Sequence, residues 1–265
     1  MGGLSLEVLI SCMNQTDMSL VSKSNITSDV LIINQCGRNA EMITEIRENQ
    51  KIRRLDVNQR GLSNSRNTAL ENAKGDICLL CDDDEAMENG YDQCILNAFK
   101  EIPKADVIVF QISNQRSKLK DKIYKLSRLE CLRVSSWQIA FRRNAVLNAN
   151  VQFDPWLGAG TEQGCGEENK FLLDCMKCGL KIYHCPTVIA SVKQEVSTWF
   201  HGYDSTFFYQ RGKVTGYILG RPTAMLYAAY YACNKKSVYE KYCSFGEALC
   251  CMLKGIWSKE SGKME

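Results

Sequence analysis

Apolar runs separated by helix-like segments limit how this chain can fold more than any other feature of its sequence. Residues 6–13, 28–36, 77–81 and 105–113 are short, rich in Val, Ile and Leu, and bounded by small or polar residues, which predicts buried β-strands. Helices are predicted between them, one starting at an N-cap formed by Ser63 or Asn64 and ending at Gly75. This alternation predicts an α/β fold, with a mostly parallel central sheet flanked by helices.

Length and composition exclude several classes of protein. At 265 residues the chain can bury the core of one large domain, with or without an appendage, and its 45% hydrophobic residues are typical of a globular protein. A net charge of +3 is too small to indicate binding to nucleic acid. The chain starts with a short apolar run and no basic leader, so we expect a cytoplasmic protein.

The fourteen cysteines have two interpretations. Without an export signal, we expect reduced thiols that serve as small core residues. One cluster, Cys175, Cys178, His184 and Cys185, has a spacing that would also suit zinc. Apolar neighbours such as Phe171 and Leu172 favour a buried helix face over a zinc site.

Three consecutive aspartates, Asp82, Asp83 and Asp84, follow the predicted strand 77–81. Ligands bind at the carboxyl ends of strands in open parallel sheets, and grouped carboxylates suit Mn²⁺ or Mg²⁺. On an extended backbone Asp82 and Asp84 share a side while Asp83 points away, so we expect Asp84 to bind the metal, with Asp82 bridging toward the metal or a ribose. The alternative is a solvated acidic turn that continues into Glu85 and Glu88.

Two segments carry motifs that resemble those of family 2 glycosyltransferases, which are inverting enzymes with the GT-A fold. The first motif set comprises Gly61, Leu62, Ser63, Ser65, Arg66, Asn67, Ala73, Gly75, Asp76, Asp82 and Asp84, and the second comprises Phe141, Arg142, Arg143, Phe153, Asp154, Leu157, Gly158, Gly160, Gly166, Glu167 and Glu168. The similarity extends over roughly the first three quarters of the chain. It implies a GT-A catalytic domain over residues 1–215, with a nucleotide-sugar half (1–110) and an acceptor half (111–215), followed by a helical extension over 216–265.

The resemblance also implies roles for individual residues. Glu168 is expected to be the general base, with Glu167 beside it for catalysis or for acceptor hydroxyls. The residues expected at the nucleotide-sugar donor are Ser11, Asn34, Arg60, Ser63, Arg66, Asp82 and Asp83, and those expected at the acceptor are Trp137, Arg142, Gly166 and Glu167. Without the motifs, Glu167 and Glu168 would be ordinary acids at a helix start and Arg66 a solvated side chain.

The sequence departs from the family pattern at two positions. Asn34 and Gln35 stand where similar enzymes commonly have an acidic residue for the nucleotide base, and Lys193 stands near the expected late metal-binding His, for which His201 is a substitute. These departures keep open a non-catalytic relative that binds a nucleotide sugar or a partner enzyme. A nucleotidyltransferase is a weaker alternative, because no glycine-rich phosphate loop follows the first strand.

The implied reaction transfers a sugar from a nucleotide donor, expected to be UDP-linked, to a glycan or polyprenyl-linked acceptor in bacterial surface polysaccharide biosynthesis. Two apolar segments edged by lysine, 221–236 and 244–263, predict helices near the end of the chain. They would either lie on the inner face of the plasma membrane or pack on the catalytic domain.

Overall fold

The computed structural model describes residues 3–114, 119–193 and 202–258, which form two compact units. Unit 1 comprises Met1–Gly160 and Glu167–Glu195, and unit 2 comprises Thr161–Gly166 and Val196–Glu265. The division precedes the expected boundary at residue 215, which falls inside a helix of unit 2.

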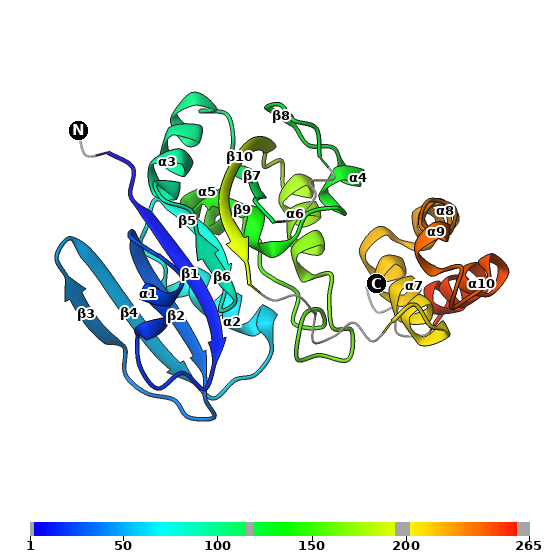
Figure 1. Cartoon of the computed structure of the whole chain (residues 1–265), viewed down its shortest axis with the longest axis horizontal. Helices are drawn as coiled ribbons and strands as arrows, with labels where there is room; N and C mark the ends of the chain where they lie inside the picture. Colours follow the sequence, from blue (N-terminus) through cyan, green and yellow to red (C-terminus); the bar gives the residue numbers. More distant parts are fainter. Residues whose placement is uncertain (1–2, 115–118, 194–201, 259–265) are drawn as a thin grey trace. The chain divides into compact units, whose positions relative to one another are not determined.

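Unit 1 is built on one sheet (Figure 1). Its strands are β1 (Leu6–Met13), β2 (Asp29–Gln35), β3 (Ile43–Arg47), β4 (Gln50–Val57), β5 (Ile77–Asp82), β6 (Glu85–Met87), β7 (Val107–Ile112), β8 (Tyr124–Lys125), β9 (Ile139–Arg142) and β10 (Ile182–Val192). The order is β3-β4-β2-β1-β5-β9-β7-β10-β6, with β8 paired to β10. The central strands β4, β2, β1 and β5 are parallel, as are β7 and β10, and the antiparallel β9 joins the two groups.

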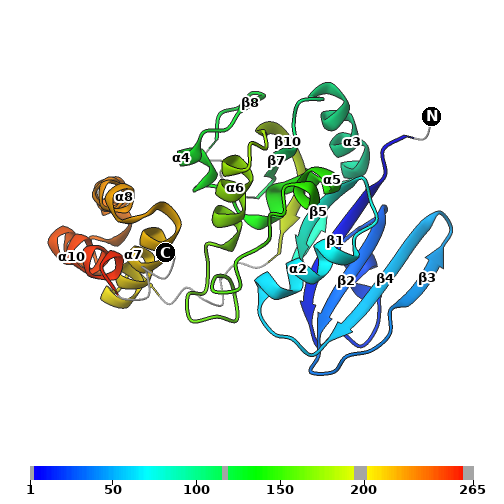
Figure 2. The same ribbon diagram turned by 180° about the vertical axis from the view of Figure 1, so that it is seen from behind.

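The described helices of unit 1 lie along this sheet. They are α1 (Ser19–Lys23), α2 (Leu62–Asn72), α3 (Tyr91–Glu101), α4 (Arg128–Cys131), the 3₁₀-helix η1 (Ser136–Gln138), α5 (Arg143–Asn148) and α6 (Glu167–Lys177). Alternate residues of β1 and β2, such as Val8 and Ile32, share one buried cluster with α1 and α3. Their neighbours, such as Leu9 and Leu31, are also buried, and α2 contacts both strands, as the view from behind shows (Figure 2). Burial on both faces explains the continuous apolar runs of the sequence.

The N-terminus of α2 differs from the prediction. Neither Ser63 nor Asn64 caps the helix, which begins after Gly61, a residue with a positive φ of 103°. The Ser63 hydroxyl instead donates to the Leu157 carbonyl oxygen at 2.7 Å. A side chain expected to cap its own helix therefore holds a loop that is distant in sequence.

Unit 2 is helical in its described residues. It contains α7 (Ser205–Leu219), α8 (Arg221–Asn234), α9 (Lys236–Tyr239) and α10 (Phe245–Ile256), so both predicted C-terminal helices are present. Its core combines Phe208 of α7, Ala228 of α8, and Met252 and Ile256 of α10, all fully buried. One face of α10 is thus packed inside the unit. No helix of the described residues is long and apolar enough to cross a membrane.

All fourteen cysteines are free thiols, and seven of them are buried, as the interpretation of core residues predicts. The set proposed for zinc does not come together. Cys175 is buried and Cys178 exposed, and His184 Nδ1 lies 2.9 Å from the Val109 carbonyl oxygen. In the described ranges, no group of three or more His, Cys, Asp or Glu side chains has the arrangement of a metal site.

Candidate active site

The carboxyl ends of the parallel strands bring four sequence-distant positions to one edge of the sheet. Asp82 at the end of β5 is in register with Ser11 of β1, the next residue Cys12 with Asn34 of β2, and Asn34 with Asp56 of β4. This edge is where open α/β sheets bind ligands. The sheet therefore places the aspartate triplet at the expected kind of site.

Arg66 links the two acidic motifs of the sequence. Its guanidinium is 2% exposed and donates to Asp82 Oδ1 at 3.0 Å and to Glu167 Oε1 at 2.9 Å. A buried arginine needs such partners, because an unpaired charge in the interior is costly. The position predicted to contact nucleotide thus holds the end of β5 against the start of α6.

The other residues of the same motif fasten α2 to the loop that precedes α6. Asn67 exchanges two hydrogen bonds with the backbone of Phe153, at 2.7 and 2.8 Å, and the Arg66 guanidinium carbon lies 5.5 Å from the centre of the Phe153 ring. Ser63 binds the same loop at Leu157, and a Cβ on Gly158 would lie 3.2 Å from both Ser63 Oγ and Glu167 Cδ. Together, these contacts of the motif residues join α2 of the predicted nucleotide-sugar half to the loop of the predicted acceptor half.

The acidic segment after β5 has more negative charge than its described surroundings neutralise. Burial, and then the charge of Asp82, raise the pKa of Asp83 and of Asp84, and raise that of the fully buried Glu85 well above its ordinary value. Both carboxylate oxygens of Asp82 are engaged, one by Arg66 and one by the Ser136 hydroxyl at 3.1 Å. Asp84 Oδ1 is buried and has no hydrogen-bond partner among the described residues. An acidic group with an unpaired carboxylate oxygen suits a hard divalent cation, for which Asp84 is the available ligand.

Glu167 and Glu168 form the first turn of α6. Glu167 Oε1 is held by Arg66, while its Oε2 is buried without a described partner. Burial, and then the charge of Glu167, raise the pKa of the half-buried Glu168 well above its ordinary value. A carboxylate whose pKa is raised in this way is suited to accept a proton near neutral pH.

Other residues expected at the donor have differing surroundings. The Ser11 hydroxyl is buried and accepts a hydrogen bond from Ser65 Oγ at 2.9 Å, so it joins β1 to α2. Arg60 is exposed, and Asp83 is the most exposed residue of the aspartate triplet, although its carboxyl group is partly desolvated. Asn34 is fully buried, donates to Asp56 Oδ1 at 2.8 Å and accepts from the Gln15 backbone at 2.9 Å.

Asp56 is a residue that the sequence analysis missed. It is buried beside Asn34, and Arg38 donates to its Oδ2 at 2.8 Å. An acidic group therefore does stand at this edge of the sheet, one strand away from the position where the family pattern suggests it. In the sequence, Asp56 stands near the end of the run Ile52–Val57, but the two arginines of that run make it unlike a buried strand.

Of the residues expected at the acceptor, Arg142 lies away from the acidic groups of the site. Trp137 is half-buried against the core. Arg142 pairs with Ile77 at the start of β5, the opposite end from Asp82, and its guanidinium donates to the Ala105 and Phe99 carbonyl oxygens at 2.9 Å each. Arg142 therefore lies outside the proposed site. Gly166 belongs to unit 2, where its positive φ of 96° and its contact with Val214 give it a structural role.

Lys193 does lie next to the aspartates, but through its backbone. Its N–H donates to the Asp84 carbonyl oxygen at 2.8 Å, whereas its side-chain Nζ donates to the Lys23 carbonyl oxygen at 2.7 Å. The ammonium is thus engaged away from the carboxylates. His201, the alternative at this position, lies outside the described residues.

Comparison with known proteins identifies the class of this chain. The sequence model of glycosyl transferase family 2 matches residues 8–161, more than half of the chain, so the protein belongs to that family. Among solved structures, residues 1–349 of S. aureus TarS in complex with UDP-GlcNAc superpose with a TM-score of 0.58 at 14% identity, covering 90% of this chain and 74% of that chain. The complex of TarS 1–349 with UDP gives a TM-score of 0.57 at 12% identity, covering 95% and 81%. No curated protein matches the sequence.

These findings confirm the predicted family and the α/β fold class. The family match ends at residue 161, before the start of α6, and the motif residues Glu167 and Glu168 follow it. The placement of Glu167 against Arg66, which also pairs with Asp82, is a property of this structure.

Proposed function

We propose that this chain is a metal-dependent, inverting glycosyltransferase that transfers a sugar from a UDP-linked donor to a glycan or lipid-linked acceptor. The observation that carries the proposal is the double ion pair of Arg66, which brings the acidic segment of β5 and the paired glutamates of α6 to one site. The complexes of TarS with UDP-GlcNAc and with UDP support a uridine nucleotide.

The donor side of the site is the edge of the sheet at β5. Asp84, with its unpaired Oδ1, would hold Mn²⁺ or Mg²⁺. Asp82, whose own oxygens accept hydrogen bonds from Arg66 and Ser136, would help to position the ion. A divalent ion there supplies Lewis-acid stabilisation of the departing diphosphate. Asn34, expected at the nucleotide, is in register with this edge and would support the donor side through its hydrogen bond to Asp56.

The acceptor side is the first turn of α6. Glu168 takes the proton of the acceptor hydroxyl while the hydroxyl oxygen attacks the anomeric carbon from the face opposite the leaving nucleotide, and this attack inverts the configuration. Glu167 is fixed by Arg66 and keeps its second oxygen for acceptor hydroxyls. The roles of the two glutamates follow from this difference in partners.

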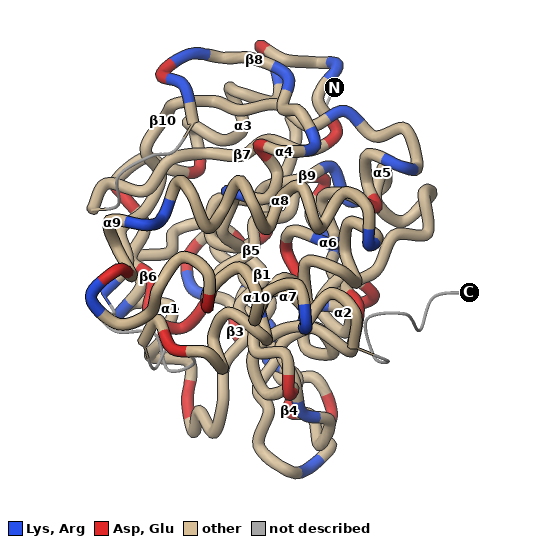
Figure 3. The backbone as a smooth tube through the Cα atoms, turned by 90° about the vertical axis from the view of Figure 1, so that its right-hand side faces the viewer, with Lys and Arg blue, Asp and Glu red and all other residues tan. Residues whose placement is uncertain are grey.

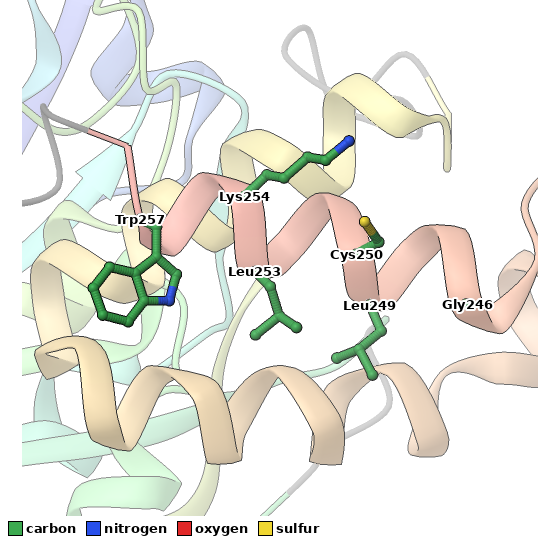
Figure 4. A pocket seen from close by; sticks show the side chains of 6 residues that line it. All are labelled: Gly246, Leu249, Cys250, Leu253, Lys254 and Trp257. Atoms are coloured by element: carbon green, nitrogen blue, oxygen red, sulfur yellow. The ribbon is translucent and has the colours of Figure 1, made fainter.

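We further propose that the enzyme works in surface polysaccharide synthesis as a cytoplasmic protein that contacts the inner face of the plasma membrane through unit 2. Lys and Arg outnumber Asp and Glu by seven to three over residues 202–258. Leu226 is 75% exposed, and the stretch of α8 between Arg221 and Lys235 carries no charge (Figure 3). On α10, Leu249, Leu253 and Trp257 project to the same side of the helix (Figure 4); the two leucines pack against the core of unit 2, and Trp257 is 58% exposed. Apolar side chains beside basic residues suit an anionic lipid surface.

Calorimetric titration of UDP tests the donor site. We expect UDP to bind in the presence of Mn²⁺ and to lose at least tenfold in affinity with EDTA, because the carboxylates would then repel the diphosphate. Asp84→Asn should cause a similar loss, whereas Asp121→Asn, the same change at an exposed carboxylate, should have no effect. Equal affinity with and without EDTA would remove the metal from the proposal.

A further inference from the structure

Glu85 follows the aspartate triplet and is the first residue of β6, but the proposed chemistry gives it no role. A solvated acidic turn, the alternative for this segment, would place Glu85 in water, whereas the structure buries it completely, with 0% of the residue exposed. Its Oε1 accepts a hydrogen bond from the Asp82 backbone N–H at 2.7 Å, and its Oε2 has no hydrogen-bond partner among the described residues. The side chain of Glu85 therefore closes the acidic turn by joining its last residue to its first.

The same turn is held from its other side by the end of β10. Only two residues separate β5 from β6, and β6 pairs antiparallel with the last residues of β10. Lys193, which follows β10, donates its backbone N–H to the Asp84 carbonyl oxygen at 2.8 Å. The backbone of the turn is thus fixed at Asp82 by the carboxyl group of Glu85 and at Asp84 by Lys193. These two contacts set the positions of the two acidic residues relative to each other.

Stability alone does not explain a carboxyl group at this position. Glu7, a buried glutamate of β1, is 2% exposed, but it is paired with Arg53 and also accepts hydrogen bonds from two backbone N–H groups. Among the described residues no Lys or Arg forms an ion pair with Glu85, which instead lies beside the like charge of Asp82. Burying an acid next to a like charge is costly, so packing alone would favour an apolar residue here.

A metal site does require a fixed turn at this position. A divalent ion such as Mg²⁺ accepts little deviation from its preferred geometry, and the groups that bind it must be held to within about 0.5 Å. Asp84 is the available ligand, and it lies two residues along the chain from the N–H that Glu85 binds. Without this hydrogen bond the turn would allow the Asp84 carboxylate a wider range of positions. The buried carboxyl group of Glu85 therefore serves the geometry of the turn.

We propose that Glu85 is a positioning residue for the metal site: its Oε1 holds the Asp82 N–H, so that the turn presents the carboxylate of Asp84 to the divalent ion. This assignment rests on the proposed function of the chain. Glu85 acts as a hydrogen-bond acceptor, and neither its charge nor direct contact with the metal is needed. A side chain with an amide oxygen can therefore replace it, and an apolar side chain of similar length cannot.

Calorimetric titration of UDP over a series of Mn²⁺ concentrations tests the role of Glu85. At limiting Mn²⁺ we expect Glu85→Met to lower the UDP affinity at least tenfold, because the displaced turn holds the metal less often. Raising the Mn²⁺ concentration should restore the affinity to within about twofold of the native value by mass action, which a general loss of structure would not allow. Glu85→Gln should match the native chain at every Mn²⁺ concentration, because its amide oxygen accepts the same N–H.

Glu7→Met is the matched control, since it removes a buried carboxyl group near the start of β1, at the opposite end of the sheet from the acidic turn. It leaves Arg53 without its partner, so it should lower the melting temperature but not change the Mn²⁺ dependence of UDP binding in the folded protein. Amide hydrogen exchange of Asp82 measures the contact itself, and it should be slow in the native chain and in Glu85→Gln but fast in Glu85→Met. Glu85→Leu is the second variant if Glu85→Met does not fold.

The role of Glu85 and the proposed function fail in different ways. Glu85→Met with the Mn²⁺ dependence of the native chain, or with slow exchange at Asp82, would show that the hydrogen bond does not position the ligand. Glu85→Gln as impaired as Glu85→Met would show that Glu85 acts through its charge or binds the metal itself. Each of these results would overturn the positioning role and leave the proposed function intact. UDP binding to the native chain that does not depend on Mn²⁺ would instead reject the metal of the proposed function, and the positioning role with it.

Discussion

Units 1 and 2 are stabilised in different ways. Unit 1 buries charge: Arg66 lies between Asp82 and Glu167, and Arg53 is paired with Glu7 in the interior of the sheet. Unit 2 brings helix backbones together through glycine. A Cβ on Gly212 of α7 would lie 2.0 Å from the Met252 carbonyl oxygen of α10, and one on Gly255 of α10 would lie 2.0 Å from the Tyr209 carbonyl oxygen of α7.

The buried ion pairs of unit 1 and the glycine contacts of unit 2 serve different purposes. Buried ion pairs add little to stability over apolar packing, but they fix charged groups in defined positions, which a catalytic site needs. Glycine contacts provide close packing without reactive groups. We therefore expect substitutions in unit 1 to affect the reaction most, and those in unit 2 to affect packing and attachment.

The largest effect is expected at Glu168. Glu168→Gln keeps the shape of the side chain but cannot take a proton, so turnover should fall by about 10²–10⁴. Because the pKa of Glu168 is raised, the rate of the native enzyme should increase with pH up to a value well above the ordinary glutamate range. Steady-state kinetics with a radiolabelled donor measure both effects.

Donor binding is the control for this variant, since UDP should bind to Glu168→Gln as it does to the native chain. The variant should also lose the acid limb of the pH profile. If Glu167→Gln lost turnover and Glu168→Gln kept it, the base would be the other glutamate.

Arg66→Met should have the next largest effect. It removes the cation between two carboxylates and leaves Glu167, whose side chain is 7% exposed, without its ion-pair partner, at a cost of about 3–5 kcal/mol in the free energy of unfolding. Arg47→Met is the matched control, because its ion pair with Glu45 is exposed on β3 and should contribute little to stability.

Urea titration followed by circular dichroism compares the two variants. A loss at Arg66 as small as that at Arg47 would show that the buried pairs do not hold the halves of unit 1 together. Unit 1 would then not be stabilised through buried ion pairs, and the proposed difference between the two units would have no energetic basis.

In unit 2, the corresponding change is Gly212→Ala. The added methyl group must push α7 away from the backbone of α10, which should cost about 1–3 kcal/mol. Gly246→Ala is the control, since a Cβ added there would meet nothing within 4 Å and alanine favours a helix by about 0.5–1 kcal/mol.

Thermal unfolding should show a lower melting temperature for Gly212→Ala and an equal or higher one for Gly246→Ala. UDP affinity at 25 °C should be the same in both. If UDP affinity fell together with stability in Gly212→Ala, packing in unit 2 would support the donor site, and the two units could not be assigned separate roles.

The extent to which the sequence predicts this structure also differs between the units. Strand β1 occupies the predicted residues 6–13, and β2 and β7 lie within the predicted runs 28–36 and 105–113, because their residues form continuous apolar runs; α1 and α3 lie between strands, where helices are expected. Strand β4 was missed because its interior positions include Arg53 and Arg54, whose charges are paired in the fold with Glu7 and Asp56. Charge pairing of this kind depends on neighbours that are distant in sequence.

The sequence points to a candidate set of site residues but not to the contacts among them. The motifs point to Asp82, Asp84 and Glu168, yet nothing local indicates that Arg66 binds two of the acidic groups. Arg142 illustrates the opposite error: it belongs to a motif, but the antiparallel pairing of β9 carries it to the far end of β5. Strand direction is a tertiary property, so a motif alone could not place this side chain.

The smallest expected effect concerns attachment to lipid. Leu226→Ser on α8 should weaken binding to phosphatidylserine-containing vesicles by about 1 kcal/mol, roughly fivefold in the partition coefficient, because interfacial burial removes part of the leucine side chain from water. Ile46→Ser is the control: Ile46 is 73% exposed on β3 of unit 1, compared with 75% for Leu226, and its loss should not change vesicle binding. Co-sedimentation at two salt concentrations measures both variants, and binding of the native chain should weaken at higher salt as the lysines of unit 2 are screened. Equal losses for Ile46→Ser and Leu226→Ser would mean that the lipid contact is non-specific, and no binding of the native chain would reject the membrane contact of unit 2.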